Sequence, residues 1–340
     1  WRGTLSADWS PRFGESGFGT GWNFGADFFW SKVRNQVFFT DARVRPNGLL
    51  TPDGRTRYSP VTSFADTNYD IILTNTNRGH SLIGVLRVNK TFDWGLDAGV
   101  SYTYQRVTDQ APATSSTATS NYANGAFLDA NGAAYGTSND EVRHSLKYNL
   151  TVNPALFGDY KTTFALFGET RIGRPYSFTM QDASSARSPV FGTVQSSSRY
   201  LLYVPTENDP LVSYDSKATQ DTFEALIKSS GLSKYRGQIA PRNAFNSKWF
   251  TRFDLHLAQE IPAFVGKSRI EVFADIENVT NLINKNWGQI REYAFPYTIP
   301  AVRVQCLTAP VATGASTTGF VAGTSTDKCV QYRYLSPNTA

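Results

Sequence analysis

Hydrophobic and polar residues alternate with a period of two along several stretches of the chain. The clearest stretch covers residues 249–261, where Phe253, Leu255 and Leu257 fall on one face and mostly polar residues fall between them. Residues 269–277 repeat the pattern. Because successive side chains of a β-strand point to opposite faces, this alternation predicts strands with one apolar and one polar face.

The same alternation recurs through the rest of the chain. The further predicted strands are residues 2–10, 23–31, 81–90, 96–105, 145–152 and 161–173. Together with the two stretches above they make about eight strands. Aromatic residues form 14% of the chain and Gly, Ser, Thr and Asn are abundant, which is typical of strands joined by turns. No stretch approaches the ~18 to 20 continuous apolar residues of a membrane-spanning helix, so we predict an all-β chain.

Short and long connections alternate between the predicted strands. The short links are residues 91–94, 153–159 and 262–267, and the long ones are about 108–141, about 179–246 and the region 282–340. In an antiparallel meander, alternate connections lie at the same end of the sheet. Short periplasmic turns and long extracellular loops give this asymmetry in a transmembrane antiparallel β-barrel, which is the fold we predict. A soluble β-sandwich also has two-faced strands and stays open as the alternative.

Charged residues of the last two strands share one face. They are Arg252, Asp254, His256, Arg269, Glu271, Asp275 and Glu277. So many charges are costly in a dry core unless they are paired, so we interpret them as a polar network that faces a wet or plugged lumen. Aromatic residues near the predicted strand ends, such as Trp30, Trp94, Tyr104 and Trp249, are typical of girdles at a membrane interface. Ordinary packing on a sheet is the simpler alternative for any one of them.

Charge and cysteine content restrict the possible partners. The formal charge of +5 is spread over scattered basic and acidic residues, which argues against nucleic acid as a partner. Cys306 and Cys329 are the only two cysteines, and in an oxidising compartment they would close one loop as a disulfide. Two unrelated free thiols are the alternative, and no spacing in the sequence suggests zinc.

Patterns typical of catalysis are missing from the sequence. His80, His144 and His256 lie on separate strands or strand ends, and none belongs to a Ser/His/Asp signature. Asp254 shares a face with His256, but a polar network explains that pair more simply than a catalytic dyad. Metal-ligand spacing and phosphate-binding loops are also missing. We therefore predict that the chain is not an enzyme and binds no metal or cofactor.

Two runs in the last third of the chain resemble the late barrel strands of Oar-like TonB-dependent receptors. They are YRGQIAPRNAFNSKWFTRFDLHLAQEIP at 235–262 and SRIEVFADIENVTNLINKNWGQ at 268–289. The IENVTNLIN core of the second run is similar to the penultimate barrel strand of that family, which leads into the last extracellular loop. Weaker similarity covers GADFFWSKVRNQVFFTD at 25–41 and SLIGVLRVNKTFDWGLDAGVSYTY at 81–104.

The resemblance implies a barrel of about 22 strands, gated by an N-terminal plug and driven by a TonB complex in the inner membrane. The chain departs from this pattern because no plug or TonB-contacting segment precedes Trp1 and no closing strand follows QYRYLSPNTA. We interpret it as a fragment of the barrel. Consecutive strands would occupy residues 1–281, and the last extracellular loop region would occupy residues 282–340, with the closing strand absent. The plug that contacts the TonB complex would lie outside this chain.

Ligand specificity is expected in the long loops, since loops on a rigid scaffold commonly carry recognition. Candidate ligand or partner contacts, each with packing as its simpler role, are Tyr200, Tyr203, Tyr214, Trp287, Tyr293 and Tyr297. Within the loop at 179–246, Asp221 is predicted to cap a short helix. Phe223, Leu226 and Ile227 share one face of that helix, which we expect to pack the loop.

Three functions stay open at this point. The first is energy-coupled passage of a large substrate, such as a peptide or protein, through a plugged barrel in the outer membrane of a Gram-negative bacterium. Its partners would be outer-membrane lipid, the TonB complex and a surface or secreted protein or peptide. The second function is a passive porin or a structural anchor for a surface partner. The third is a soluble, secreted β-rich binding domain.

Overall fold

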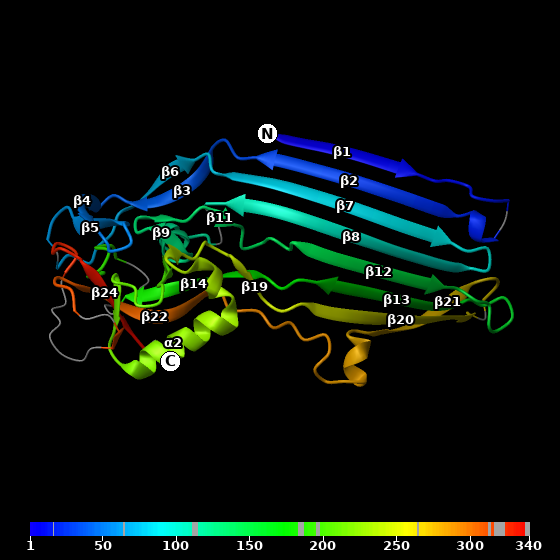
Figure 1. Ribbon diagram of the computed structural model, residues 1–340. Coiled ribbons are helices and arrows are strands. Elements are labelled where there is room, and N and C mark those ends of the chain that lie inside the picture. The colour runs from blue at the N-terminus through cyan, green and yellow to red at the C-terminus, as the bar shows by residue number, and fades with distance from the viewer. Residues whose placement is uncertain are drawn as a thin grey trace.

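Eight long strands form one open antiparallel sheet (Figure 1). The strands are β1 (Arg2–Trp9), β2 (Trp22–Lys32), β7 (Gly79–Thr91), β8 (Leu96–Asp109), β12 (His144–Val152), β13 (Thr162–Arg171), β20 (Phe250–Pro262) and β21 (Arg269–Ile276). Each strand pairs with the next one of this series, so the sheet is a meander. The computed structural model describes residues 1–15, 17–63, 65–110, 115–182, 187–194, 198–263, 265–311, 314–315 and 324–336.

These eight strands coincide with the eight predicted from the alternation of residues. Strands account for 49% of the structure and helices for 10%, which agrees with the predicted all-β class. The agreement has a simple cause. A period of two is a local property of the sequence, so it marks a two-faced strand whatever that strand later pairs with.

The strand register keeps the two faces of the sheet distinct from one edge to the other. Leu86 lies opposite Tyr102, and Leu166 lies opposite both Leu150 and Leu255. We call this side the apolar face; it carries Leu5, Ala26, Phe28, Leu86, Val100, Tyr102, Leu150, Leu166, Leu255, Leu257, Val272 and Ala274. The other side is the polar face. On the apolar face Leu86 is 60% exposed and Leu5 is 71% exposed, so no layer of described residues covers them.

The connections at the two ends of this sheet differ in length. Short turns join β7 to β8, β12 to β13 and β20 to β21 at one end, which lies on the right in Figure 1. The longer segments gather at the other end, on the left. We call the structure that they form the loop body; it comprises the described parts of residues 33–78, 110–143, 172–249 and 283–336.

The loop body contains a second sheet of mixed direction. Its strands, in spatial order, are β10 (Gly132–Ala133), β9 (Phe127–Asp129), β15 (Tyr200–Leu201), β14 (Pro175–Asp182), β22 (Thr298–Leu307), β24 (Gln331–Leu335), β17 (Val212–Tyr214) and β23 (Gly314–Ala315), with β19 (Phe245–Asn246) beside β14. The smaller pairs are β3 (Gln36–Asp41) with β6 (Ile71–Thr76), β4 (Val44–Leu50) with β5 (Thr56–Pro60), and β16 (Tyr203–Val204) with β18 (Gln238–Ile239). β11 (Gly136–Thr137) pairs with the end of β8. The segments expected to be loops therefore carry a sheet of their own.

The buried hydrophobic cluster lies in the loop body and not between two layers of the large sheet. Its members come from residues 44–58, 122–130, 178–240 and 301–334. Met180, Val302 and Tyr334 have no exposed surface. They stand on β14, β22 and β24, which pair in that order through the middle of the second sheet. The loop body thus has its own core, as an independently folded unit requires.

Two longer helices and three short 3-10 turns complete the structure. They are α1 (Ala118–Ala123), α2 (Lys217–Ser230), η1 (Gly17–Gly19), η2 (Leu232–Tyr235) and η3 (Val279–Leu282). The prediction that Asp221 caps the helix was wrong. α2 begins a turn earlier, where the side chain of Ser216 accepts a hydrogen bond from the backbone of Thr219. Asp221 instead pairs with Lys217 on the exposed side of the helix, while Phe223 and Ile227 are buried as expected.

Among the helices of the described ranges, none is long and apolar enough to cross a membrane.

Candidate functional site

The charged residues predicted from the last strands do share one side of the large sheet. The register places His256 opposite Asp275, and their Nδ1 and Oδ1 atoms lie 2.7 Å apart. Arg252 and Asp254 pair along β20 at 3.0 Å. Arg269 pairs with a carboxylate that the sequence analysis had not named, that of Glu260. Glu271 is exposed on the same face, and Glu277 follows β21 with the same parity.

Four of these side chains, those of Asp254, His256, Asp275 and Glu277, border a shallow hollow on the polar face. It has a volume of about 380 Å³ and spans β12, β13, β20 and β21. Asn149 and Thr151 line one side, and His256, Asp275 and Glu277 line the other. Side chains that are paired yet half-exposed keep much of their hydration, so this surface suits contact with water or a polar solute.

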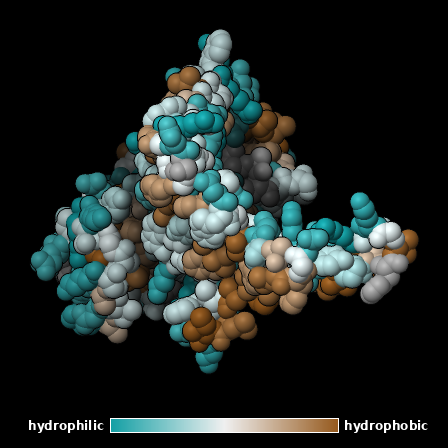
Figure 2. Space-filling view, turned by 90° about the vertical axis from the view of Figure 1, so that its right-hand side faces the viewer, coloured by the Kyte–Doolittle hydropathy of each residue, from teal (hydrophilic) through white to brown (hydrophobic). Residues whose placement is uncertain are grey.

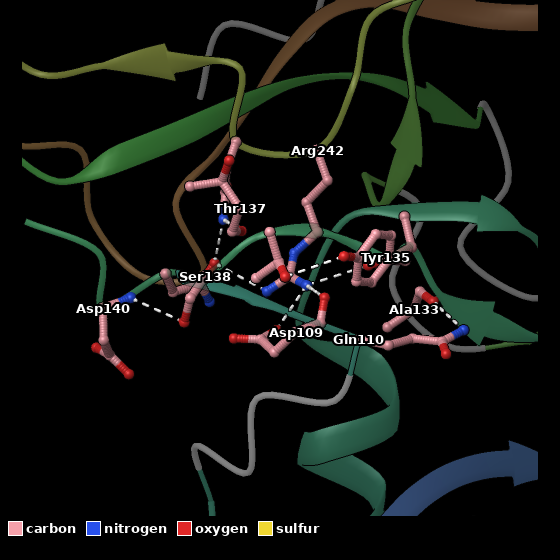
Figure 3. A network of polar contacts seen from close by, with 12 residues as sticks. Asp109, Gln110, Ala133, Tyr135, Thr137, Ser138, Asp140 and Arg242 are labelled. Carbon is pink, nitrogen blue, oxygen red and sulfur yellow. Dashed lines mark hydrogen bonds and ion pairs between the residues drawn. The ribbon is translucent and has the colours of Figure 1, made fainter. Parts of the chain in front are cut away.

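A second polar network joins the loop body to the end of the sheet (Figure 3). Arg242 belongs to the loop body and is only 3% exposed. Its Nη1 donates to the Asp109 carboxylate at 2.8 Å and to the Ala134 carbonyl at 3.1 Å. Beside it, the Asn243 amide donates to Asn139 Oδ1 at 2.7 Å. Arg242 therefore links the loop body to β8. Removing one partner of a buried ion pair leaves an unpaired buried charge, which strongly destabilises the fold.

The loop body itself has a polar groove of about 490 Å³ between the pair β3–β6 and the pair β9–β10. Tyr58 Oη donates to Asp129 Oδ1 at 2.8 Å on its wall. Burial and the nearby Asp129 charge raise the pKa of Tyr58 above its ordinary value, so it stays a neutral donor. Gly132 lets Phe38 approach closely, since a Cβ there would stand 2.4 Å from the Phe38 ring. Arg78 adds a positive charge to the lining.

Sequence reasoning missed this groove because its residues come from segments that are far apart in the chain. Its one local signal is the run Asp129-Ala-Asn131-Gly132, which is typical of a tight turn. That signal indicates a hairpin and not a binding surface. The other walls come from residues 38–58 and 75–78, whose pairing partners no periodicity identifies.

Three of the six predicted contact residues are buried in the loop body core. Tyr200 is 1% exposed and its hydroxyl lies 2.8 Å from that of Thr193. Tyr203 donates to Asp209 at 2.8 Å. Tyr214 is 5% exposed and packs beside Tyr334. These three side chains have the packing role, and in this conformation they offer almost no surface to a ligand.

The other three lie at the surface. Trp287 is 50% exposed and lines a cavity beside β20. The centroids of the Tyr293 and Tyr176 rings lie 4.5 Å apart. Burial is the main cause that raises the pKa of Tyr176 to about 12, and the Tyr293 hydroxyl is the second. Tyr297 is half-buried and lies under the guanidinium of Arg174. The structure thus separates the six predicted contacts into a buried group and a surface group.

Cys306 and Cys329 are joined by a disulfide between β22 and the segment before β24. Their Cα atoms lie 5.4 Å apart, which is within the range of a disulfide. In the part of the chain that the structure describes, no group of three or more His, Cys, Asp or Glu side chains could hold a metal ion.

Comparisons with known proteins identify no relative of this chain. No family model matches it, and no curated protein and no solved structure matches it either. The geometry of the large sheet and of the loop body therefore carries the argument for function.

Proposed function

We propose that this chain is part of a transmembrane β-barrel in the bacterial outer membrane, of the Oar-like TonB-dependent type. The barrel would carry a bulky substrate, such as a peptide or protein, past a plug that draws energy from a TonB complex. One observation supports this most strongly. The large sheet exposes apolar side chains on one face and paired charges on the other, and the protein's buried core lies elsewhere.

The size of the exposed apolar face supports contact with lipid. Eight strands spaced ~4.8 Å apart, with apolar positions spread over ~27 Å of strand, cover on the order of 900 Å². Soluble monomers expose apolar patches of about 300–600 Å². Figure 2, seen from the short-turn end, shows apolar side chains at the bottom centre and along the underside of the arm at the right, with hydrophilic ones above them on that arm. In lipid the apolar side would meet acyl chains and the polar side would meet water.

Strand length also fits a membrane. A tilted spanning β-strand needs about 9–11 residues. β12 has 9 residues, β13 has 10 and β2 has 11, while β7 and β20 have 13 each. β1 and β21 have 8 residues each and form the two edges of the sheet. Strands of this length can cross the bilayer. If further strands closed the sheet into a barrel, no backbone group would be left unpaired in lipid.

Aromatic side chains stand at both ends of the apolar face, as interfacial girdles require. At the short-turn end, Trp9 is 61% exposed and packs beside Phe24, while Trp94 is 67% exposed. At the loop-body end, Tyr104 and Trp249 both pack on His144. The amphipathic rings of Trp and Tyr favour the headgroup level, so the two rows fit the two interfaces.

The loop body supports a receptor role at the outer surface. Short turns are typical of the periplasmic end of an outer-membrane barrel, and long segments are typical of the extracellular end. The groove of about 490 Å³ lies in the loop body, where an incoming substrate would first meet the protein. Its mixture of aromatic, amide and charged side chains suits a peptide better than a purely apolar ligand.

The test is membrane topology in cells that express the full-length protein. Glu207→Cys on the loop body should react with a membrane-impermeant maleimide on intact cells, because the loop body faces outward. Asp159→Cys, in the turn between β12 and β13, should react only after the outer membrane is opened. The protein should also stay in the membrane fraction until detergent is added. Release without detergent, or equal labelling of both variants, would overturn the proposal and favour a soluble secreted domain.

Energy coupling needs a separate measurement. Uptake or export of the substrate should stop in cells that lack TonB, while the amount of protein in the membrane stays unchanged. Passage that continues without TonB would favour the second function, a passive porin or a structural anchor.

A further inference from the structure

The segment at residues 278–291, which lies between Glu277 and Glu292, exposes several large apolar side chains among mostly polar residues. Residues 278–291 contain Lys285 and Arg291 but no Asp or Glu. Leu282 is 77% exposed and Ile283 is 79% exposed. Large aliphatic side chains rarely point into water in a run unless another apolar body covers them. Exposed apolar side chains and two cations on one segment suit a partner that is both apolar and negatively charged.

A cavity of about 490 Å³ separates this segment from the first residues of β20. Phe253 lines it from β20, Trp249 from the residue just before β20, and Trp287 from the segment. Its volume lies within the range of about 300–1,000 Å³ that is typical of small-molecule sites. Trp249 and Phe253 have the parity of Leu255, so the cavity continues the apolar face at the end nearer the loop body.

Two cations stand at this cavity. Lys248 and Arg291 both line it and both are exposed. Glu292 is the adjacent carboxylate, and it is engaged by Arg171 at 3.2 Å and by Arg174 at 3.4 Å. Its charge is therefore compensated away from the cavity. The result is an apolar slot with a net positive rim.

We propose that this cavity binds one acyl chain of a lipid whose phosphate headgroup carries a net negative charge. The chain would lie between the rings of Trp249, Phe253 and Trp287, and the phosphate would meet Lys248 and Arg291. This inference rests on the proposed function, because only a membrane protein presents this face to lipid. The charge of the rim selects an anionic headgroup over a neutral one.

The position of the cavity favours lipid over a protein partner. It lies on the apolar face in the same row as Trp249, which is the row assigned above to the interface nearer the loop body. A basic site at the membrane interface lies level with the lipid phosphates, and aromatic rings at the interface commonly mark the edge of the acyl region.

The experiment titrates the detergent-solubilised full-length protein with phosphatidylglycerol and with phosphatidylcholine, and counts bound lipid by native mass spectrometry. We expect tighter binding of phosphatidylglycerol. Lys248→Gln and Arg291→Gln should each weaken it about 5-fold, the effect of one surface cation on an anionic lipid. Lys285→Gln is the matched control, since Lys285 is on the same segment but does not line the cavity. Trp287→Ala should weaken the binding of both lipids.

Several results would overturn the inference while leaving the proposed function intact. Equal losses from Lys285→Gln and Lys248→Gln would indicate a diffuse basic surface. Inorganic phosphate makes only the charge contacts. If an excess of about 10-fold inorganic phosphate displaced phosphatidylglycerol, the cavity would be an anion site without an acyl slot. Preservation of phosphatidylglycerol binding in all the variants would exclude the cavity as the site. A protein that leaves the cell without detergent would instead refute the proposed function itself, and this inference with it.

Discussion

Buried charges are concentrated in the loop body, where each has a specific partner. Asp53 accepts hydrogen bonds from Arg55 at 2.6 Å, from Thr51 at 2.6 Å and from the Tyr332 hydroxyl at 2.9 Å. Arg55 also donates to the Leu201 carbonyl at 2.9 Å. This cluster ties the hairpin β4–β5 to the second sheet, although the residues come from opposite ends of the chain. Burial by itself would raise the pKa of Asp53, but the charge and hydrogen bond of Arg55 lower it below its ordinary value.

The first prediction concerns Asp53→Asn. The substitution leaves the buried Arg55 guanidinium without its carboxylate, so we expect the loop body to lose about 3 kcal/mol of stability. Asp70→Asn is the control, because Asp70 is 62% exposed and its pair with Arg43 is a surface pair worth less than about 1 kcal/mol. The measurement is the thermal midpoint of the purified protein. Equal shifts for the two variants would mean that the Asp53 cluster adds nothing specific.

The second prediction is the pH dependence of the same residue. The pKa of Asp53 is lower in the folded than in the unfolded protein, so the charged carboxylate stabilises the fold above pH ~4. This contribution is lost as the pH falls through the folded-state value. The wild-type thermal midpoint should therefore drop more steeply than that of Asp53→Asn below pH ~4. Parallel curves for the two proteins would contradict the assignment.

At the level of single elements, neighbouring residues on a strand of the large sheet lie in different environments, one on the polar face and one on the apolar face. Val85 and Leu86 are neighbours on β7 and point to opposite faces. Val85 lies opposite Asp27 and Thr103 on the polar face, whereas Leu86 lies opposite Tyr102 on the apolar face. The same substitution at the two positions therefore tests which face of the sheet meets an apolar environment and which meets water.

The third prediction compares Leu86→Lys with Val85→Lys in the full-length protein. In the proposed barrel, a lysine on the lipid side near the middle of a strand would cost about 2–4 kcal/mol, because its charge would have no water or partner there. A lysine at position 85 would stand beside Asp27 in a wet space and should cost little. The readout is the amount of folded protein in the outer membrane, followed by its urea midpoint in detergent. A larger loss from Val85→Lys would show that the faces are assigned the wrong way round.

The eight long strands were predictable from the sequence, whereas the loop body was not. Alternation depends on neighbours two residues apart, so it survives without knowledge of the fold. The second sheet depends on partners far apart in the chain, such as Ser177 beside Thr298 in the parallel pair of β14 and β22. No periodicity encodes such a partner. Its strands are also buried on both faces, which removes the alternation. Six of the eight residues of β14 and four of the five residues of β24 are buried.

The candidate site divides in the same way. The charged residues of β20 and β21 could be predicted to share one face, because their spacing of two residues is visible within each strand. It offered Tyr200, Tyr203 and Tyr214 as surface contacts, since a tyrosine in a polar segment gives no local sign of burial. The helix cap was misplaced because Ser216 and Asp221 are both good N-cap residues, and in the structure it is the Ser216 side chain that accepts the bond from Thr219.

On the scale of the whole molecule, the two parts draw their stability from different sources. The loop body has a buried hydrophobic cluster, buried ion pairs and the disulfide between Cys306 and Cys329. The large sheet has exposed apolar side chains and two open edges at β1 and β21. In the proposed barrel, its stability would come from backbone pairing, from lipid on its apolar face and from closure with further strands. Arg242 is a buried charge at the junction, where it pairs with Asp109 of β8.

The last prediction follows from this difference. The cysteines are 23 residues apart, and a crosslink over a loop of that length stabilises by about 3 kcal/mol. Reduction of the disulfide, or the change Cys306→Ser with Cys329→Ser, should therefore raise amide hydrogen exchange in β22 and β24. It should leave β7 and β8 unchanged, because in the proposed membrane barrel lipid and strand pairing would hold them. Delipidation should do the reverse. If either treatment raised exchange equally in both parts, the molecule would be one cooperative unit, and the assignment of separate sources of stability to the two parts would be wrong.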